Sequence, residues 1–203
     1  MRNDMNEVNL TGTLMENAQY SHMAFGEPIY RARMAVRRKS GAEDYIILQM
    51  GMHTVGRRVD MLSAGEKLSV SGQLRGYQRD AVARTILVMH VLAMREGGEE
   101  DNNLVSLNGL LMRAPVFRIT PQGREICDLM VRAQRGDKWV NVPVIAFGRV
   151  ARWASMLECG ERVKVRGRLQ SREYTRRTED GTDAVITTHE VAASWMALED
   201  APE

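Results

Sequence analysis

The sequence predicts an all-β chain made of two tandem copies of one small five-stranded barrel. Three observations predict it: an internal repeat, segments in which apolar and polar residues alternate, and one helical pattern in each copy. With 203 residues, the chain is long enough for two small domains. We place domain 1 at 1–95, an acidic linker at 96–102, domain 2 at 103–198 and a short acidic tail at 199–203.

The repeat is clearest in a block that recurs 95 residues further along the chain. Residues 62–74 and 157–169 both fit the pattern L-x-x-G-E-[KR]-[LV]-x-V-x-G-x-L without a gap. Two more blocks match earlier in each copy and in the same order, residues 8–14 with 105–111 and residues 34–37 with 129–132. Three matched blocks in one order argue against chance similarity between unrelated strands.

Alternation predicts the strands. In the second copy Val163, Val165 and Leu169 point to one side of a strand, and the four cations Arg162, Lys164, Arg166 and Arg168 point to the other. Gly167 lies inside this strand and predicts a bulge or a sharp bend, as small barrels need at their corners.

The helix of each copy is predicted just before that strand. In the second copy the apolar residues recur at i, i+3, i+4 and i+7, and a glycine follows where a helix C-terminus favours one. The residues are Val150, Trp153, Ala154, Leu157 and Gly160, with Val55, Val59, Leu62 and Gly65 in the first copy. Three strands, a helix and two strands in about 95 residues suit a five-stranded OB-fold barrel with one short helix.

Charge and composition exclude several classes of protein. The net charge is only +2, but residues 1–95 carry +4 and residues 103–198 carry +5, while the linker and the tail together carry −7. Mildly basic domains permit a polyanionic partner. No apolar run approaches the roughly 18 residues of a membrane helix, and the N-terminus lacks a signal-like apolar core. With only two cysteines, we expect a cytoplasmic protein without a disulfide framework.

We predict no enzyme, no metal site and no cofactor. The four histidines are scattered, and two cysteines offer no metal-ligand spacing. The glycine spacing of residues 51–58 resembles a phosphate loop but lacks its Lys and Ser/Thr. No Ser/His/Asp set or carboxylate pair stands out in the sequence.

The second copy resembles the bacterial single-stranded DNA-binding protein family. The matching segments begin with the first strand and end with T-T-H-E-V, and they span nearly all of residues 103–198. They are residues 105–111, 115–123 (P-V-F-R-I-T-P-Q-G), 144–151 (V-I-A-F-G-R-V-A), 160–174 and 187–191. The resemblance implies an OB fold and sequence-independent binding of single-stranded DNA during replication, recombination or repair.

By this resemblance Phe147 and Tyr174 stand where the family stacks bases, and Trp139 lies near a third such position. Base stacking tolerates any base, and cations along the strand add a salt-sensitive phosphate term. The alternatives are a core position for Phe147 and a surface or dimer contact for Trp139. The cations that we predict to contact DNA in this copy are Arg118, Arg149, Arg162, Lys164, Arg166, Arg168 and Arg172.

The first copy keeps the repeat pattern but lacks many of the aromatic and basic residues that the family resemblance assigns to DNA binding. Met52-His53-Thr54 stands where Phe147-Gly148-Arg149 stands in the second copy. Tyr77 follows the shared G-x-L block much as Tyr174 does, and Tyr45 loosely parallels Trp139. Arg31, Arg33 and Arg37 share one strand face, which predicts a separate phosphate track. In contrast, we expect Trp153 in the core or in an interface, and assign no role to Trp195.

The family typically assembles four OB domains, which predicts a homodimer of this two-domain chain. The family's acidic-hydrophobic C-terminal tip, which recruits replication partners, has no counterpart before Glu203. Such recruitment is therefore not expected, and its absence favours a protein of a mobile element over a housekeeping one. Since the chain has only 11 aromatic residues, an OB-fold protein–protein module or a relative of primosomal replication protein N is the alternative function.

Overall fold

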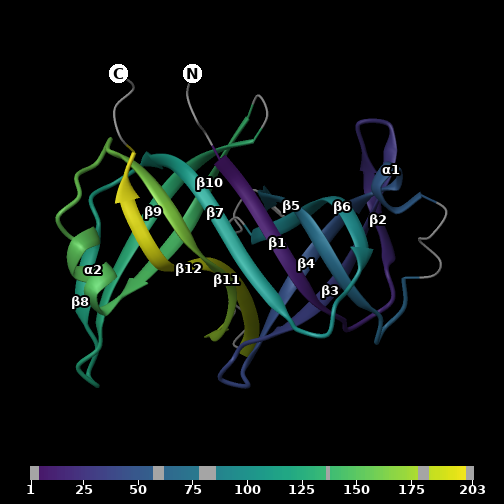
Figure 1. Cartoon of the computed structure of the whole chain (residues 1–203), viewed down its shortest axis with the longest axis horizontal. Coiled ribbons are helices and arrows are strands. Elements are labelled where there is room, and N and C mark those ends of the chain that lie inside the picture. The colour runs from purple at the N-terminus through teal and green to yellow at the C-terminus, as the bar shows by residue number, and fades with distance from the viewer. Residues whose placement is uncertain (1–4, 57–61, 78–85, 136–137, 178–182, 200–203) are drawn as a thin grey trace.

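The computed structural model describes residues 5–56, 62–77, 86–135, 138–177 and 183–199, and it forms two barrels that lie side by side (Figure 1). Strands β1 to β6 and helix α1 form the first half, and strands β7 to β12 and helix α2 form the second. Their bounds are β1 (Met5–Leu14), β2 (Gln19–Ala24), β3 (Glu27–Arg37), β4 (Glu43–Gly51), α1 (Met52–Val55), β5 (Lys67–Tyr77), β6 (Ile86–Glu96), β7 (Asn102–Leu111), β8 (Val116–Ile119), β9 (Glu125–Arg135), β10 (Lys138–Phe147), α2 (Gly148–Ala154), β11 (Arg162–Arg177) and β12 (Asp183–Leu198).

Each half closes into a five-stranded barrel of OB topology. In the first half the order is β1-β3-β4-β6-β5 and back to β1, and β4 and β6 pair in parallel. The second half repeats this as β7-β9-β10-β12-β11. A sixth short strand in each half, β2 or β8, lies outside the barrel and pairs only with β3 or β9 among the described strands. The predicted fold class is confirmed.

A glycine permits each barrel to close. Strand β1 bends so that it pairs with β5 along most of its length and with β3 at its end. At this bend a Cβ on Gly12 would lie 2.3 Å from the carbonyl oxygen of Ala35. Gly109 of β7 has the same relation, 2.3 Å, to the carbonyl oxygen of Arg132. A side chain at either glycine would force the two strands apart.

The bulge predicted at Gly167 is confirmed. The pairing of β11 with β12 shifts between Arg166 and Gly167, and that of β5 with β6 shifts between Ser71 and Gly72. The strands bend there, as a small barrel needs. Burial alternates along β11: Val163, Val165 and Leu169 are buried, and the cations between them are more exposed.

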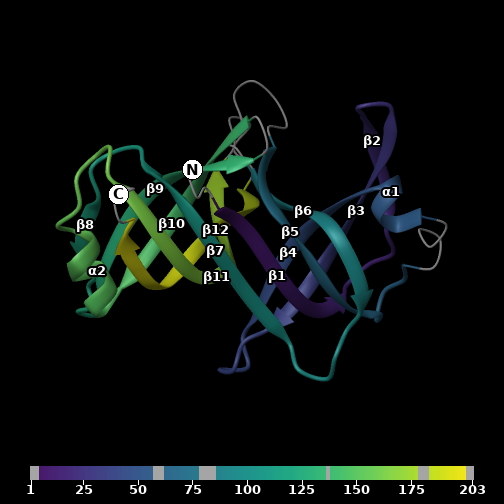
Figure 2. The same cartoon turned by 45° about the horizontal axis from the view of Figure 1, so that its top comes forward.

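The two barrels share one continuous sheet. Strands β1 and β7 pair antiparallel along Met5–Thr11 and Asn102–Asn108, which joins twelve strands into a single sheet (Figures 1 and 2). Val8 lies opposite Val105, its own counterpart in the repeat, so a local two-fold axis relates the barrels at this point. Both valines are fully buried, and a single cluster of buried apolar side chains extends through both barrels.

The helices are shorter than predicted. Helix α2 ends at Ala154 with Ser155 as its C-cap, so Leu157 lies beyond it, and Gly160 (φ +94°) lies in the turn before β11 rather than at the helix end. Helix α1 ends at Val55, Gly65 (φ +89°) lies in the corresponding turn, and Val59 lies outside the described residues. Trp153 packs against the core, as expected. Within the described residues, no helix is long and apolar enough to span a membrane.

The third repeat block has a different register from the one predicted. The close contacts at Gly12 and Gly109 make Ala35 the counterpart of Arg132, two residues from the predicted match with Met130. A slip of two residues keeps every side chain on its face, so alternation alone does not reveal it.

Candidate nucleic-acid interface

The outer face of the second barrel brings an aromatic ring and a cation together. Phe147 on β10 pairs with Ile126 on β9, which pairs with Arg118 on β8, so the three form one row across the sheet. Phe147 is 40% exposed, which argues against a core role for its ring. Asp128 accepts a hydrogen bond from Arg118 Nε at 2.8 Å and raises the pKa of this guanidinium.

Trp139 occupies the other end of the same face of β10. Eight residues separate it from Phe147, which is about 26 Å along an extended strand. Its side chain is 48% exposed and opposes Gln134 of β9. The two rings therefore do not share one stacking position, but they lie on one face that a strand of several nucleotides would span.

The cations of β11 have different surroundings. Arg162 is ion-paired with Glu199 at 2.6 Å. Arg166 is exposed and lies over the ring of Trp195, 5.6 Å from its centroid. Trp195 is 45% exposed, so the structure adds a cation–aromatic pair that sequence reasoning missed. The sequence could have indicated Trp195 only through the expected pairing of the last two strands, which places it opposite Arg166, a predicted DNA contact.

Four further residues were predicted to contact DNA: Arg149, Arg172, Tyr174 and Tyr77. Arg149 and Arg172 are exposed, on α2 and β11. Tyr174 and Tyr77 are paired in their strands with Ile186 and Ile86, and the positions of their rings lie outside the described part of the structure.

The predicted first-barrel track is partly engaged with acids. Arg33 is ion-paired with Glu16 at 3.3 Å, and Arg37 with Glu43 at 3.5 Å. Arg31 lies on the same side of β3 and is half-buried. These pairs are exposed and therefore weak, so a phosphate can compete for both guanidinium groups.

Neither Phe147 nor Trp139 of the second barrel has an aromatic counterpart in the first. Ile29 pairs with Gly51 as Ile126 pairs with Phe147, so Gly51, not Met52, stands at the position of Phe147. Tyr45 pairs with Ala35, which makes Asn141, not Trp139, its counterpart. The predicted parallel between Tyr45 and Trp139 is therefore wrong by two residues.

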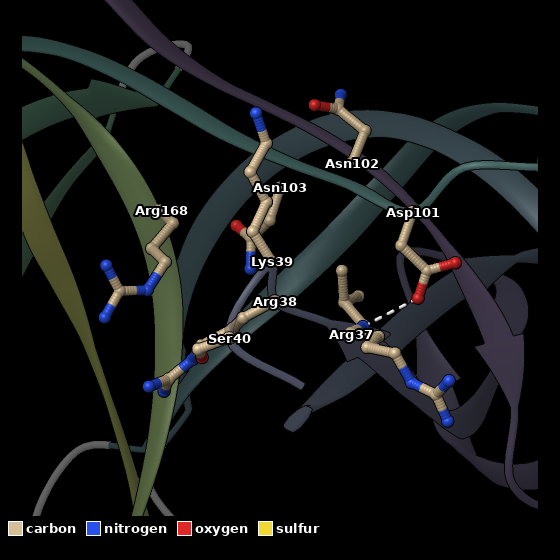
Figure 3. A pocket seen from close by; sticks show the side chains of 9 residues that line it. Arg37, Arg38, Lys39, Ser40, Asp101, Asn102, Asn103 and Arg168 are labelled. Atoms are coloured by element: carbon tan, nitrogen blue, oxygen red, sulfur yellow. Dashed lines mark hydrogen bonds between the residues drawn. The ribbon is translucent and has the colours of Figure 1, made fainter. Parts of the chain in front are cut away.

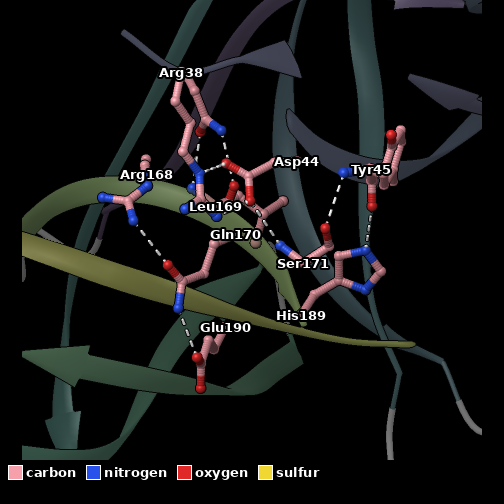
Figure 4. A network of polar contacts seen from close by, with 10 residues as sticks. Arg38, Asp44, Tyr45, Arg168, Leu169, Gln170, Ser171, His189 and Glu190 are labelled. Atoms are coloured by element: carbon pink, nitrogen blue, oxygen red, sulfur yellow. Dashed lines mark hydrogen bonds and ion pairs between the residues drawn. The ribbon is translucent and has the colours of Figure 1, made fainter. Parts of the chain in front are cut away.

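Tyr45 instead lies where the two halves meet (Figure 4). Its backbone N–H donates to Ser171 Oγ at 2.9 Å, and its carbonyl oxygen is 2.8 Å from His189 Nε2. The Tyr45 hydroxyl donates to Glu43 at 3.1 Å, which raises the pKa of this phenol. Burial lowers the pKa of His189, so the neutral imidazole donates Nε2–H to the Tyr45 carbonyl.

A fully buried carboxylate completes this junction. Asp44 accepts two hydrogen bonds from Arg38, at 2.7 and 2.5 Å, and one at 3.1 Å from the backbone N–H of Ser171. The first barrel supplies the acid and the arginine, and the second barrel supplies the amide. A buried charge-assisted pair of this kind fixes geometry more than it adds stability.

One asparagine in each half holds the strand beside the predicted cations. Asn103 donates from its amide to the Leu169 carbonyl and accepts from the Leu169 N–H, both at 2.8 Å. Asn6 makes the same pair with Leu74, at 3.1 and 2.9 Å. We call this arrangement the asparagine clamp. It was missed from sequence because Asn103 and Leu169 are 66 residues apart.

The structure brings together cations that were predicted separately in the first and in the second copy. Arg37 of the first barrel and Arg168 of the second line one pocket at the junction, although they belong to different copies. Phe147 and Arg118 lie in one row across the sheet, with Ile126 between them. In contrast, Trp139 is remote from Phe147. No group of three or more His, Cys, Asp or Glu side chains in the described residues is arranged to hold a metal ion.

The chain is similar to single-stranded DNA-binding proteins in both sequence and fold. Residues 102–196 match the model of the single-strand binding protein family. The single-stranded DNA-binding protein of Thermus aquaticus is 26% identical over 207 residues, which cover 86% of this chain and 78% of that protein. The crystal structure of the wild-type T. aquaticus protein covers 98% of this chain and 95% of its own, with a TM-score of 0.79 and 23% identity. A deletion mutant of it gives 0.78 and 24% identity, with 100% and 98% covered. The solved structures thus share the fold along the whole chain.

Proposed function

We propose that this chain, whose residues 102–196 match the model of the single-strand binding protein family, is a member of that family that binds single-stranded DNA without sequence preference and protects it in replication, recombination or repair. The observation that carries the proposal is the outer face of the second barrel. There Phe147 and Trp139 offer exposed rings, and Arg118 and the Arg166–Trp195 pair add cations. No base-specific device is needed, because every base has a face for stacking.

We assign the two repeats, residues 1–95 and 103–198, to two DNA-binding domains with unequal roles. The second supplies the aromatic rings, Phe147 and Trp139 with Tyr174, and the cations of β11 other than Arg168, which lies at the junction of the barrels. The first supplies Arg31, Arg33, Arg37, Tyr45 and Tyr77. Because Gly51 replaces the Phe147 ring, the first domain depends more on phosphate contacts than on stacking. Two chains then assemble as a homodimer with four OB domains.

Titration with oligo-dT tests this function. Tryptophan and tyrosine fluorescence is followed while strand is added, at low and at high salt. Stacking quenches the rings, and each neutralised phosphate contributes about −0.7 to the slope of log K against log salt. We expect strong quenching that weakens with salt, and much weaker binding of a duplex of the same length. No quenching up to micromolar strand would overturn the proposal and favour a protein–protein module.

A further inference from the structure

A basic pocket opens where the two barrels meet (Figure 3). Its volume is about 430 Å³, and three separate segments line it: residues 36–40 at the end of β3, residues 101–103 at the start of β7, and Arg168 of β11. Four of its nine lining residues are cations and one is an acid. We call it the junction pocket.

The charges around the junction pocket are not balanced. Its acid, Asp101, is ion-paired with Lys67 at 2.9 Å and accepts a hydrogen bond from the Arg37 backbone N–H at 2.6 Å. Arg38 is neutralised by Asp44. Within the described part of the chain, Lys39 and Arg168 have no ion pair. The pocket therefore holds an excess of positive charge.

The buried Nε–H of Arg168 has no hydrogen-bond acceptor among the described residues. The Nη2 of the same guanidinium donates to Gln170 at 2.9 Å. Burial first, and then repulsion from Arg38, lowers the pKa of this guanidinium. A half-buried charge with an unpaired donor is costly, and an oxyanion would remove that cost.

The cations are held in place by the junction itself. The asparagine clamp fixes Leu169, directly beside Arg168, and Gln170 is held in turn by Glu190 at 2.7 Å. Arg38 is fixed by the buried Asp44, which also binds the N–H of Ser171 on β11 (Figure 4). The guanidinium groups of Arg168 and Arg38, one from each barrel, are therefore ordered before any ligand binds, which favours binding.

We propose that the junction pocket binds a phosphodiester group of a DNA strand that passes from one barrel to the other, with Arg168 and Lys39 as its ligands. The planar guanidinium fork matches two phosphate oxygens, and Lys39 adds a mobile point charge. The first repeat does not offer an equivalent ligand, because Gln73 stands there at the position of Arg168. The proposal rests on the proposed function, since it places a strand on the protein.

The test measures the binding of a long and a short DNA strand to the wild type and to three variants. Arg168→Gln introduces the residue type that the first repeat carries at this position, and Arg168→Lys keeps the charge without the fork. Arg113→Gln is the matched control: it is exposed and follows the far end of β7, about 30 Å along the strand from residues 101–103. A dT strand of about 8 nucleotides fits one barrel, and one of about 35 crosses both.

We expect Arg168→Gln to weaken binding of the long strand about five- to tenfold and to reduce its salt slope by about 0.7, with little effect on the short strand. Arg168→Lys should retain part of the affinity. Thermal unfolding confirms that the variants remain folded. Equal losses for both strand lengths, or equal affinities of Arg168→Gln and Arg113→Gln for the long strand, would overturn the proposal.

Two more outcomes separate the possible failures. If inorganic phosphate raises the Tm of the wild type above that in chloride of equal ionic strength, but not that of Arg168→Gln, while both bind the long strand equally, the pocket is a free-anion site and the strand proposal is wrong. If the wild type binds neither strand, the proposed function itself fails.

Discussion

At the scale of single residues, Phe147 is the sharpest test of stacking. Its ring is 40% exposed, beside Ile126 and in one row with Arg118. Because stacking on one ring is worth about 1–3 kcal/mol per base, Phe147→Ala should weaken oligo-dT binding at least fivefold. Phe147→Tyr should keep most of the affinity, since it keeps the aromatic face. Fluorescence titration at one fixed salt concentration measures both.

The control separates stacking from packing. Met156 is 72% exposed and lies after α2, so Met156→Ala removes apolar surface without an aromatic ring. It should leave the strand affinity unchanged. If Phe147→Ala instead lowers the Tm and leaves the Kd as it was, the ring is a structural side chain and not a base platform.

At the scale of elements, the bulges of β5 and β11 determine how each barrel bends. A Cβ on Gly72 would lie 2.0 Å from the carbonyl oxygen of His90, which is backbone and does not yield. Gly72→Ala should therefore lower the free energy of unfolding by about 2–4 kcal/mol, because the paired strands must separate. Gly98→Ala is the control, since a Cβ there meets no atom within 4 Å. Urea unfolding of both variants measures the difference, and equal midpoints would contradict this account of the bulge.

The same elements show how far a single sequence predicts the fold. Alternation, the repeat and Gly167 were enough for two barrels and the bulge, because each is a local pattern. They were not enough for register along β3, where a slip of two residues preserves every face. The close approach of Gly12 to the backbone of Ala35 settles that register, and it joins residues that are 23 apart.

The candidate site likewise contains residues that local sequence patterns indicate and residues that only the fold brings together. Arg118 and Phe147 could be proposed from the sequence because they lie in segments that resemble a family. The junction was not found, because Asp44, Arg38, Ser171 and His189 meet only when β4 contacts β11 and β12. A buried acid such as Asp44 also looks like any exposed acid beside a turn until the fold supplies its partners. The contribution of Trp195 likewise depends on a cross-strand neighbour.

At the scale of the whole molecule, the local two-fold axis at Val8 and Val105 bears on assembly. Two barrels joined by β1 and β7 already form a pseudo-symmetric pair within one chain. A second two-fold contact between chains would give four barrels, and closed symmetry of this kind is the common arrangement of oligomers. We therefore expect multi-angle light scattering at micromolar concentration to give twice the chain mass of 22.9 kDa. A dilution series distinguishes a stable dimer from a weak one, because a weak dimer loses mass as it is diluted. A mass of one chain at every concentration would refute the four-barrel assembly, and it would leave the continuous sheet of this chain as the complete binding unit.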